Sequence, residues 1–190
     1  MLTTNNLFLG PKLKLTTARA EDVQTMLTWN EDPEYLRHVD TDAAIPYSER
    51  QLEGEQDSKD REVYFRLRTR TEDELIGFVV IHSIEWNNRT GQLAIGIGLS
   101  KHRNQGYGTE ALQLILRYAF YELNLDRVGL DVISYNAKAI RAYEKAGFQQ
   151  EGRLRSAVYR DGQRYDRILM GILRSEWEVR QQTQDKVGLE

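Results

Sequence analysis

The sequence predicts an α/β domain of the α+β type, in which helices flank one twisted sheet. Three observations support this prediction. Apolar residues alternate with period two over much of 63–100, which indicates strands. Residues 107–146 change to a helix, strand and helix pattern. Asp161-Gly162 then marks a hairpin turn.

The N-terminal third predicts one strand and two short helices. Leu13 and Leu15 alternate with lysines, as in a half-buried strand. Residues 21–30 carry apolar side chains at helical spacing behind an acidic first turn. Ser48 is followed three residues later by Gln51, a capping box that predicts a second helix near residue 48.

The middle of the chain predicts three antiparallel strands. Residues 63–68 alternate apolar and polar side chains, 75–84 form an apolar run, and 92–100 alternate again. Polar turns at 71–74 and 87–90 separate them. Because the connections are short, we expect neighbouring strands to pair as a meander.

The C-terminal half predicts two helices around a strand, then a hairpin and a last helix. Gly147 follows the second of these helices and is expected to end it. With the four strands already described, the strands here bring the sheet to seven. The predicted elements are a helix at 107–124, a strand at 128–132, a helix at 136–146, strands at 152–159 and 165–173, and a helix at 174–182.

Composition excludes several classes of function. Lys plus Arg number 26 and Asp plus Glu 29, a net charge of −3 that argues against a nucleic-acid partner. No apolar run of about 18 residues or signal-peptide pattern is present, so we expect a cytoplasmic protein with no membrane partner. Cysteine is absent, which removes a thiol nucleophile. His38, His82 and His102 lack metal-ligand spacing, so we predict no metal and surface or turn positions for all three.

The strand at 92–100 has one face made only of small residues, among them Gly96 and Gly98. Glycine inside a strand costs stability and marks a bulge or a close approach to the backbone. Two interpretations stay open. An extended ligand could lie against this strand and bind its N–H groups, or a closely packed helix or a bulge could require the glycines.

The loop before the helix at 107–124 has the features of an anion site. Residues 103–108, with the sequence Arg-Asn-Gln-Gly-Tyr-Gly, lead directly into the helix. A helix N-terminus leaves about four N–H groups unpaired, and glycines let the backbone close around a phosphate. The sequence is neither a Walker loop nor the dinucleotide fingerprint. A tight strand–helix turn without a ligand is the alternative.

Asn136 and Tyr143 are the third feature. Asn136 is placed as a helix N-cap, which alone would account for it. Tyr143 lies seven residues later on the same predicted helix, and half-buried packing is the usual fate of such a tyrosine.

Taken together, these motifs resemble the GNAT superfamily of acetyl-CoA-dependent N-acetyltransferases, in particular the branch of ribosomal-protein N-terminal and spermidine acetyltransferases. The likeness extends from Leu7 to the hairpin at 159–162. The order and spacing of the motifs together are specific, whereas each motif alone is not. The motifs are Ile95-Gly96-Ile97-Gly98, Arg103-x-x-Gly106-x-Gly108-Thr109-Glu110-Ala111 and Asn136-x-x-Ala139-Ile140-x-x-Tyr143-Glu144-Lys145-x-Gly147-Phe148.

The resemblance implies a mixed sheet that is splayed between the strands at 92–100 and 127–134, with pantetheine in the opening. Main-chain N–H groups of 103–108 would bind the pyrophosphate, Asn136 would touch the cofactor, and Tyr143 would protonate the CoA thiolate. Asn104 and Gln105 depart from the usual Gly or basic residues, so less positive charge faces the phosphates. The implied acetyl-CoA-binding residues are Ile97, Gly98, Leu99, Arg103, Asn104, Gln105, Gly106, Tyr107, Gly108, Thr109, Asn136 and Tyr143.

The chemistry requires a neutral amine, an oxyanion donor and a proton for the thiolate. An N–H near Gly98 or Leu99, left unpaired by the splay, would be the oxyanion donor. Without cysteine, direct attack in a ternary complex is favoured over a covalent acyl-enzyme. Asp131 is the first candidate for the base, since it resembles a family position often held by Glu. It would share a partly buried face with Gly129 and Ile133.

Glu85 is the second candidate for the base. For both carboxylates an ordinary hydrogen-bonded or exposed role is the alternative, and a chain of water molecules would also serve.

We expect one N-acetyltransferase domain over residues 1–190, with acetyl-CoA bound by 92–148 and the acceptor by 21–62. The acidic residues of 21–62 suit a polyamine, a peptide or protein N-terminus, or an amine-bearing antibiotic equally. A non-catalytic acyl-CoA-binding or sensor module is the alternative, and a homodimer is left open. The aromatic candidates for the acceptor side are Trp29, Tyr35, Tyr47 and Trp86.

Overall fold

The chain forms the elements that the sequence predicts, together with one more α-helix and a short 3-10 helix. A computed structural model describes residues 6–54 and 60–187, so 55–59 of the expected acceptor side lie outside the described residues. The elements are β1 (Leu13–Thr16), α1 (Asp22–Asn30), α2 (Pro33–Val39), α3 (Glu49–Gly54), β2 (Val63–Thr69), β3 (Leu75–Glu85), β4 (Thr90–Ile97), η1 (Ser100–His102), α4 (Tyr107–Tyr121), β5 (Arg127–Ile133), α5 (Ala137–Ala146), β6 (Gln149–Arg160), β7 (Gln163–Leu173) and α6 (Arg174–Val187).

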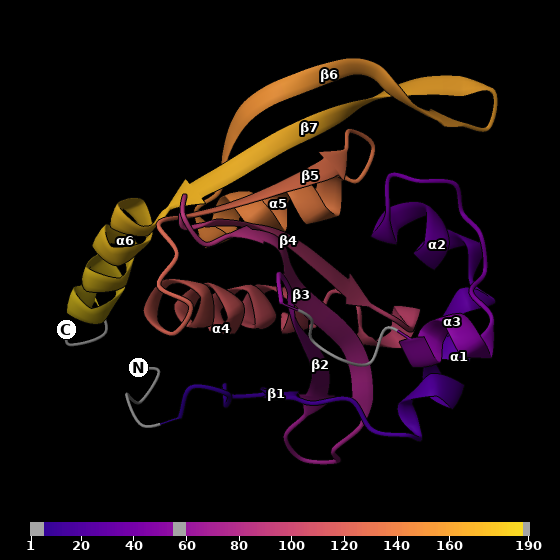
Figure 1. The fold of residues 1–190 in the computed structure, drawn as a ribbon, viewed down its shortest axis with the longest axis horizontal. Coiled ribbons are helices and arrows are strands. Elements are labelled where there is room, and N and C mark those ends of the chain that lie inside the picture. The colour runs from indigo at the N-terminus through magenta and orange to yellow at the C-terminus, as the bar shows by residue number, and fades with distance from the viewer. Residues whose placement is uncertain (1–5, 55–59, 188–190) are drawn as a thin grey trace.

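Seven strands make one mixed sheet in the order β1-β2-β3-β4-β5-β7-β6 (Figure 1). Every neighbouring pair is antiparallel except β4 and β5, which are parallel and joined through α4. These two strands pair only from Thr90–Arg127 to Gln92–Gly129 and then diverge. The splay that the family resemblance implies is therefore present.

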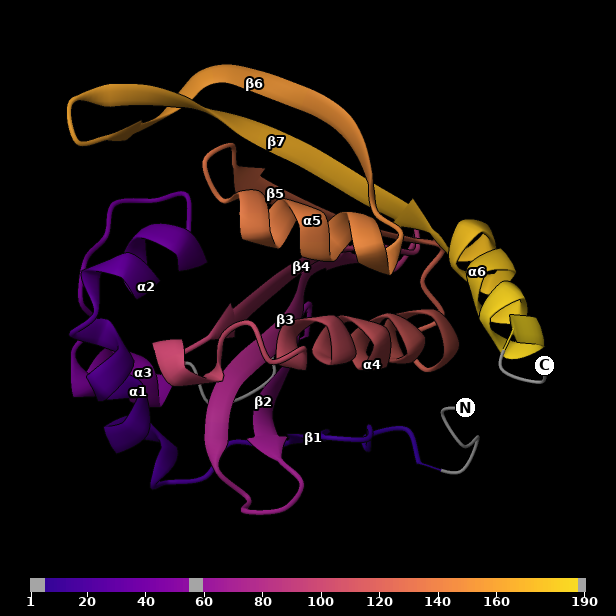
Figure 2. The same cartoon turned by 180° about the vertical axis from the view of Figure 1, so that it is seen from behind.

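Helices on opposite sides of the sheet define two apolar clusters. α4 and α5 lie side by side over one face (Figure 2), and the larger cluster fills the space between them and the strands. α1, α2 and α3 gather around a second cluster that includes Trp29, Tyr35 and Leu52. No helix among the described residues combines the length and the apolar character needed to cross a bilayer.

Local signals in the sequence explain where several elements begin and end. The Ser48 capping box is confirmed, because its N–H donates to Gln51 Oε1 at 2.9 Å. Gly147 ends α5 with a φ of 111°, as expected. The hairpin turn is also confirmed, since Asp161 and Gly162 both adopt positive φ (49° and 75°), the geometry of a two-residue turn.

The helix α2 was not predicted, although its start is encoded locally. Asp32 is the N-cap, and its Oδ1 accepts from Glu34 N at 2.8 Å. Pro33 occupies the first helical position, which suits its fixed φ. An Asp-Pro pair before a helical segment was the available signal.

Several predicted bounds were wrong. The strand predicted to begin at 152 begins at Gln149, and the helix predicted to end at 182 continues to Val187. The strand predicted to reach Ser100 ends at Ile97, and Ser100–His102 form the 3-10 helix η1. The helix predicted to reach residue 124 ends at Tyr121. There the chain turns through Asn124, whose φ is positive at 54°.

Candidate active site

The space between β4 and β5 beyond Gln92 and Gly129, called the gap below, is lined by backbone polar groups. Gly98 N–H donates to Ile76 O at 2.9 Å, so this N–H points toward β3 and away from the gap. Because hydrogen-bonding direction alternates along a strand, Ile95 and Ile97 direct their N–H and C=O groups into the gap. Gly98 N–H is therefore not available as the expected oxyanion donor.

The glycines of β4 and the residue after it are explained by packing rather than by a ligand. A Cβ on Gly98 would lie 2.2 Å from the Trp29 ring, and one on Gly96 would lie 2.6 Å from the Phe78 ring. Of the two open interpretations, the closely packed helix is confirmed, since Trp29 belongs to α1. The backbone groups that β4 leaves unpaired lie at its other side, along the edge that faces the gap.

The N-terminus of α4 is free to receive an anion. Gly106 precedes the helix with a φ of 85°, and no side chain of the described residues caps it. The first helical N–H groups, those of Tyr107, Gly108 and Thr109, have no partner within the helix. A Cβ on Gly108 would meet no atom within 4 Å, so this turn faces open space.

A lysine that the sequence analysis missed stands beside this loop. Lys12 Nζ donates to Gln105 O at 3.0 Å. Its backbone is fixed by buried Glu110, whose Oε1 accepts from the N–H groups of Lys12 and Leu13 at 2.8 Å each. The contact joins residues 93 positions apart, so no local pattern could have revealed it.

Arg103 is directed away from the helix N-terminus. Its guanidinium donates to Gly98 O at 2.7 Å and to Asp32 Oδ2 at 3.2 Å, and its N–H donates to Ser100 O at 3.0 Å. Neither the backbone N–H nor the guanidinium of Arg103 therefore points toward the first turn of α4. In this arrangement Arg103 joins the loop to the start of α2.

Asn136 and Tyr143 belong to α5. Asn136 is the N-cap, with Oδ1 accepting from Ala139 N at 3.2 Å and Nδ2 donating to His38 O at 3.4 Å. Both ends of its amide are thus bound within the chain. The Tyr143 ring packs against Phe148 at 5.8 Å between centroids and is 8% exposed.

The hydroxyl of Tyr143 has no hydrogen-bond partner among the described residues, although the side chain is buried. Burial, and then the charge of Asp131, raise the pKa of Tyr143 to about 12. The phenol consequently holds its proton throughout the physiological pH range, as a proton donor must before it acts.

The two predicted bases are not equally placed. Asp131 lies just past the last β4–β5 pair, but its side chain is 40% exposed and its Oδ2 is 3.5 Å from Arg167 Nε. The expectation that Asp131 is partly buried was therefore wrong. Glu85 pairs with Thr90, about 10 Å of strand before the gap opens, and Asn88 binds its carboxylate.

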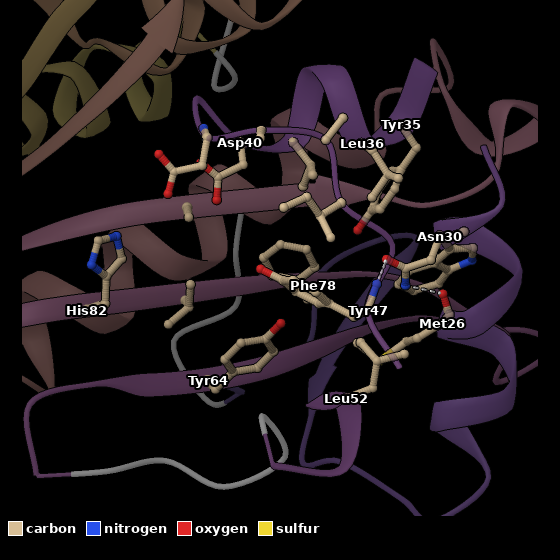
Figure 3. Close-up of a pocket in the computed structure, with 18 of the residues that line it drawn as sticks. Met26, Asn30, Tyr35, Leu36, Asp40, Tyr47, Leu52, Tyr64, Phe78 and His82 are labelled. Atoms are coloured by element: carbon tan, nitrogen blue, oxygen red, sulfur yellow. Dashed lines mark hydrogen bonds between the residues drawn. The ribbon is translucent and has the colours of Figure 1, made fainter. Parts of the chain in front are cut away.

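A cavity of about 460 Å³ lies on the side of the sheet that carries α1, α2 and α3 (Figure 3). Figure 3 shows His82 and Asp40 toward one end and Met26 and Asn30 toward the other. Trp86 is absent from the walls and instead donates its ring N–H to Asp60 O at 3.2 Å. The predicted aromatic residues that do line this acidic cavity are Trp29, Tyr35 and Tyr47, and the carboxylates are Asp40, Asp42 and Glu62.

A mixed sheet that parts between two parallel strands, with a free helix N-terminus beside the opening, defines an acyltransferase of the kind the sequence resembles. Residues 12–149 match the family model described as the acetyltransferase (GNAT) domain, and the chain belongs to this family. It is an acetyl-CoA-dependent N-acetyltransferase. Family membership favours the enzyme over the non-catalytic alternative.

Relatives span most of the chain. The SPbeta prophage-derived uncharacterized N-acetyltransferase YokL of Bacillus subtilis is 27% identical over 171 residues, 90% of this chain and 94% of the relative. The putative ribosomal N-acetyltransferase YdaF of the same organism is 31% identical over 55% of this chain and 56% of its own. A crystal structure of spermidine N-acetyltransferase from Vibrio cholerae, in complex with CoA and spermine, is similar with a TM-score of 0.79 and 25% identity, covering 88% and 99% of the two chains.

Replacing Gly98 with alanine tests why this glycine is required. Because its new Cβ would collide with the Trp29 ring, we expect G98A to lower the free energy of unfolding by about 1–3 kcal/mol. Urea unfolding without any ligand measures this. The matched control is G108A, whose new Cβ meets no atom within 4 Å, so we expect its free energy of unfolding to stay close to that of the wild type. A G98A variant as stable as the wild type would contradict the packing explanation.

Proposed function

We propose that the protein transfers the acetyl group of acetyl-CoA to a primary amine of a polycationic acceptor, of which polyamines are the first choice. The observation that supports this choice is the acidic cavity, which joins the carboxylates Asp40, Asp42 and Glu62 to aromatic walls. Carboxylates attract ammonium groups, and aromatic faces bind cations and methylene chains. Basic peptide N-termini carry their charges on side chains, and amine-bearing antibiotics such as aminoglycosides carry them on rings, so neither offers ammonium groups spaced along a flexible methylene chain.

In this proposal acetyl-CoA occupies the gap and the acceptor occupies the cavity, on the two sides of one sheet. Pantetheine would pair with the outward backbone groups of Ile95, Ile97 and Leu99. The pyrophosphate would accept from amides between Asn104 and Thr109, where α4 adds its partial positive charge. Lys12 would supply the positive charge that Asn104 and Gln105 do not.

The acetyl transfer would proceed by direct attack of the amine on the thioester. Leu99 lies seven residues past Gln92, about 23 Å of strand from the start of the gap. Of the N–H groups that face the gap, that of Ile95, three residues past Gln92, is the better candidate for the oxyanion donor. Tyr143, which keeps its proton because its pKa is raised, would protonate the CoA sulfur as it leaves. No cysteine is present to form an acyl-enzyme.

A CoA-release assay across amine acceptors tests the function. We expect spermidine and spermine to be acetylated with the highest kcat/KM, and a monoamine of similar length to be poor, because a single ammonium group is attracted less strongly by the negative charge of the cavity. Peptides with a basic N-terminus and an aminoglycoside complete the panel. Equal activity on the monoamine would contradict the polycation proposal, and no release with any amine would contradict N-acetylation of these acceptors.

Replacing Tyr143 with phenylalanine tests the proton donor. The variant keeps the ring packing on Phe148 but loses the phenol, so kcat should fall about tenfold while the Kd for acetyl-CoA changes little. Steady-state kinetics and calorimetry measure the two quantities. The control is Tyr121→Phe, whose ring is half exposed beside Trp177 on α6. An unchanged kcat would remove Tyr143 from the mechanism.

Replacing Lys12 with glutamine tests the phosphate site. Losing one charged contact worth roughly 1.5 kcal/mol should weaken acetyl-CoA binding about tenfold, with kcat at saturation preserved. The matched control, Lys14→Gln, removes a lysine two residues away whose Nζ pairs with Asp73 at 2.8 Å. If both variants bind acetyl-CoA equally well, Lys12 has no part in the phosphate site.

A further inference from the structure

A polar stripe crosses the sheet at the point where β4 and β5 part. His82 on β3 is the direct partner of Gln92 on β4, and Gln92 is the partner of Gly129 on β5. A Cβ on Gly129 would lie 2.8 Å from Gln92 Oε1, so these side chains share one face. Asp131, two residues after Gly129, lies on that face as well. His82 therefore lies beside the point where the gap between β4 and β5 begins.

The backbone of β3 is irregular immediately after His82. The β3–β4 register shifts between His82 and Glu85, and Ser83 adopts a positive φ of 50°. Such bulges cost energy for a non-glycine residue and re-aim neighbouring side chains beside active sites. His82 Nδ1 lies 3.1 Å from Ser83 Oγ, and Nε2 has no partner among the described residues. The ring lines the acidic cavity and projects on the side of Asp40 (Figure 3).

The charges around His82 suit a group that gains a proton and then loses it. Burial lowers the pKa of His82 below its usual 6.5, so the ring is neutral at pH 7. Three carboxylates from different segments oppose this effect: Glu62 before β2, Asp131 on β5 and Asp40 after α2. They would stabilise the imidazolium once it forms. Asp131 is shared with Arg167, which lies 3.5 Å away.

We propose that His82 is the catalytic base, which accepts through Nε2 the proton that the acceptor amine loses as it attacks the thioester. This inference rests on the proposed function and deepens it. The predicted bases are less well placed, because Asp131 is held by Arg167 outside the cavity walls and Glu85 lies before the gap opens. The prediction of surface or turn positions was therefore wrong for His82, which lines the cavity from β3, and also for His102, whose side chain is only 8% exposed.

His82 and Tyr143 together account for the protons that the reaction moves. The amine lone pair forms the C–N bond and the carbonyl oxygen takes the negative charge, while the N–H proton moves to His82. The C–S bond then breaks, and the sulfur takes the phenol proton of Tyr143. Solvent carries the proton from the imidazolium to the phenolate, so both residues return to their starting states and CoA leaves as a thiol.

Replacing His82 with glutamine tests the proposal, with spermidine and acetyl-CoA as substrates between about pH 5 and pH 9. We expect kcat to fall about 100-fold with the KM for acetyl-CoA unchanged. The acidic limb of the wild-type kcat profile, with an apparent pKa below 6.5, should disappear. Imidazole added to His82→Ala should restore part of the activity. The control is His38→Gln, which removes an exposed imidazole outside the cavity walls.

The outcomes separate this inference from the proposed function. If the wild type acetylates spermidine but His82→Gln keeps its kcat within about twofold, the function stands and His82 is not the base. A loss of activity with the pH profile preserved and no imidazole rescue also overturns the proposal, since it indicates a structural role. If the wild type acetylates no amine in the panel, the proposed function fails and this inference fails with it.

Discussion

The separation of β4 from β5 after three paired residues is the constraint on which the rest of this structure depends. Backbone N–H and C=O groups inside a sheet are normally satisfied by the next strand. Here the strands part at Gln92 and Gly129, so the groups of Ile95 and Ile97 face a gap that a ligand or water must satisfy. In the proposed function, the same separation would give access to a thioester in the gap from both sides of the sheet, which a continuous sheet would forbid.

The helix α2 is tied to both strands that border the gap. On the β4 side, Arg103 donates to Gly98 O and to Asp32, the N-cap of α2. On the β5 side, the Tyr135 hydroxyl donates to Arg37 O. The Arg37 guanidinium in turn binds Asp161 of the hairpin with two bonds of 2.7 Å. These contacts fix the width of the opening and place the wall of the acidic cavity beside it.

The distribution of charge matches the two reactants, although the net charge of −3 is unremarkable. Lys12 and the free N-terminus of α4 make one site positive, which suits the phosphates of a CoA carrier. Asp40, Asp42 and Glu62 make the cavity negative, which suits an ammonium acceptor. Separate sites of opposite sign would allow both partners to bind without competing, as the proposed direct attack requires.

The sequence by itself determined the strands, the hairpin, the N-cap Asn136 and the glycine-rich loop, because periodicity, capping and turn geometry depend on neighbours within a few residues. The family likeness added the splay. Only the tertiary structure decided which side chains reach the site. The Trp29 ring occupies the space beside Gly98. Lys12 donates to Gln105 O, 93 positions along the chain, and the Arg103 guanidinium donates to Asp32. His82 reaches the cavity through a bulge and cross-strand pairing, and contacts between segments so distant in sequence leave no local pattern.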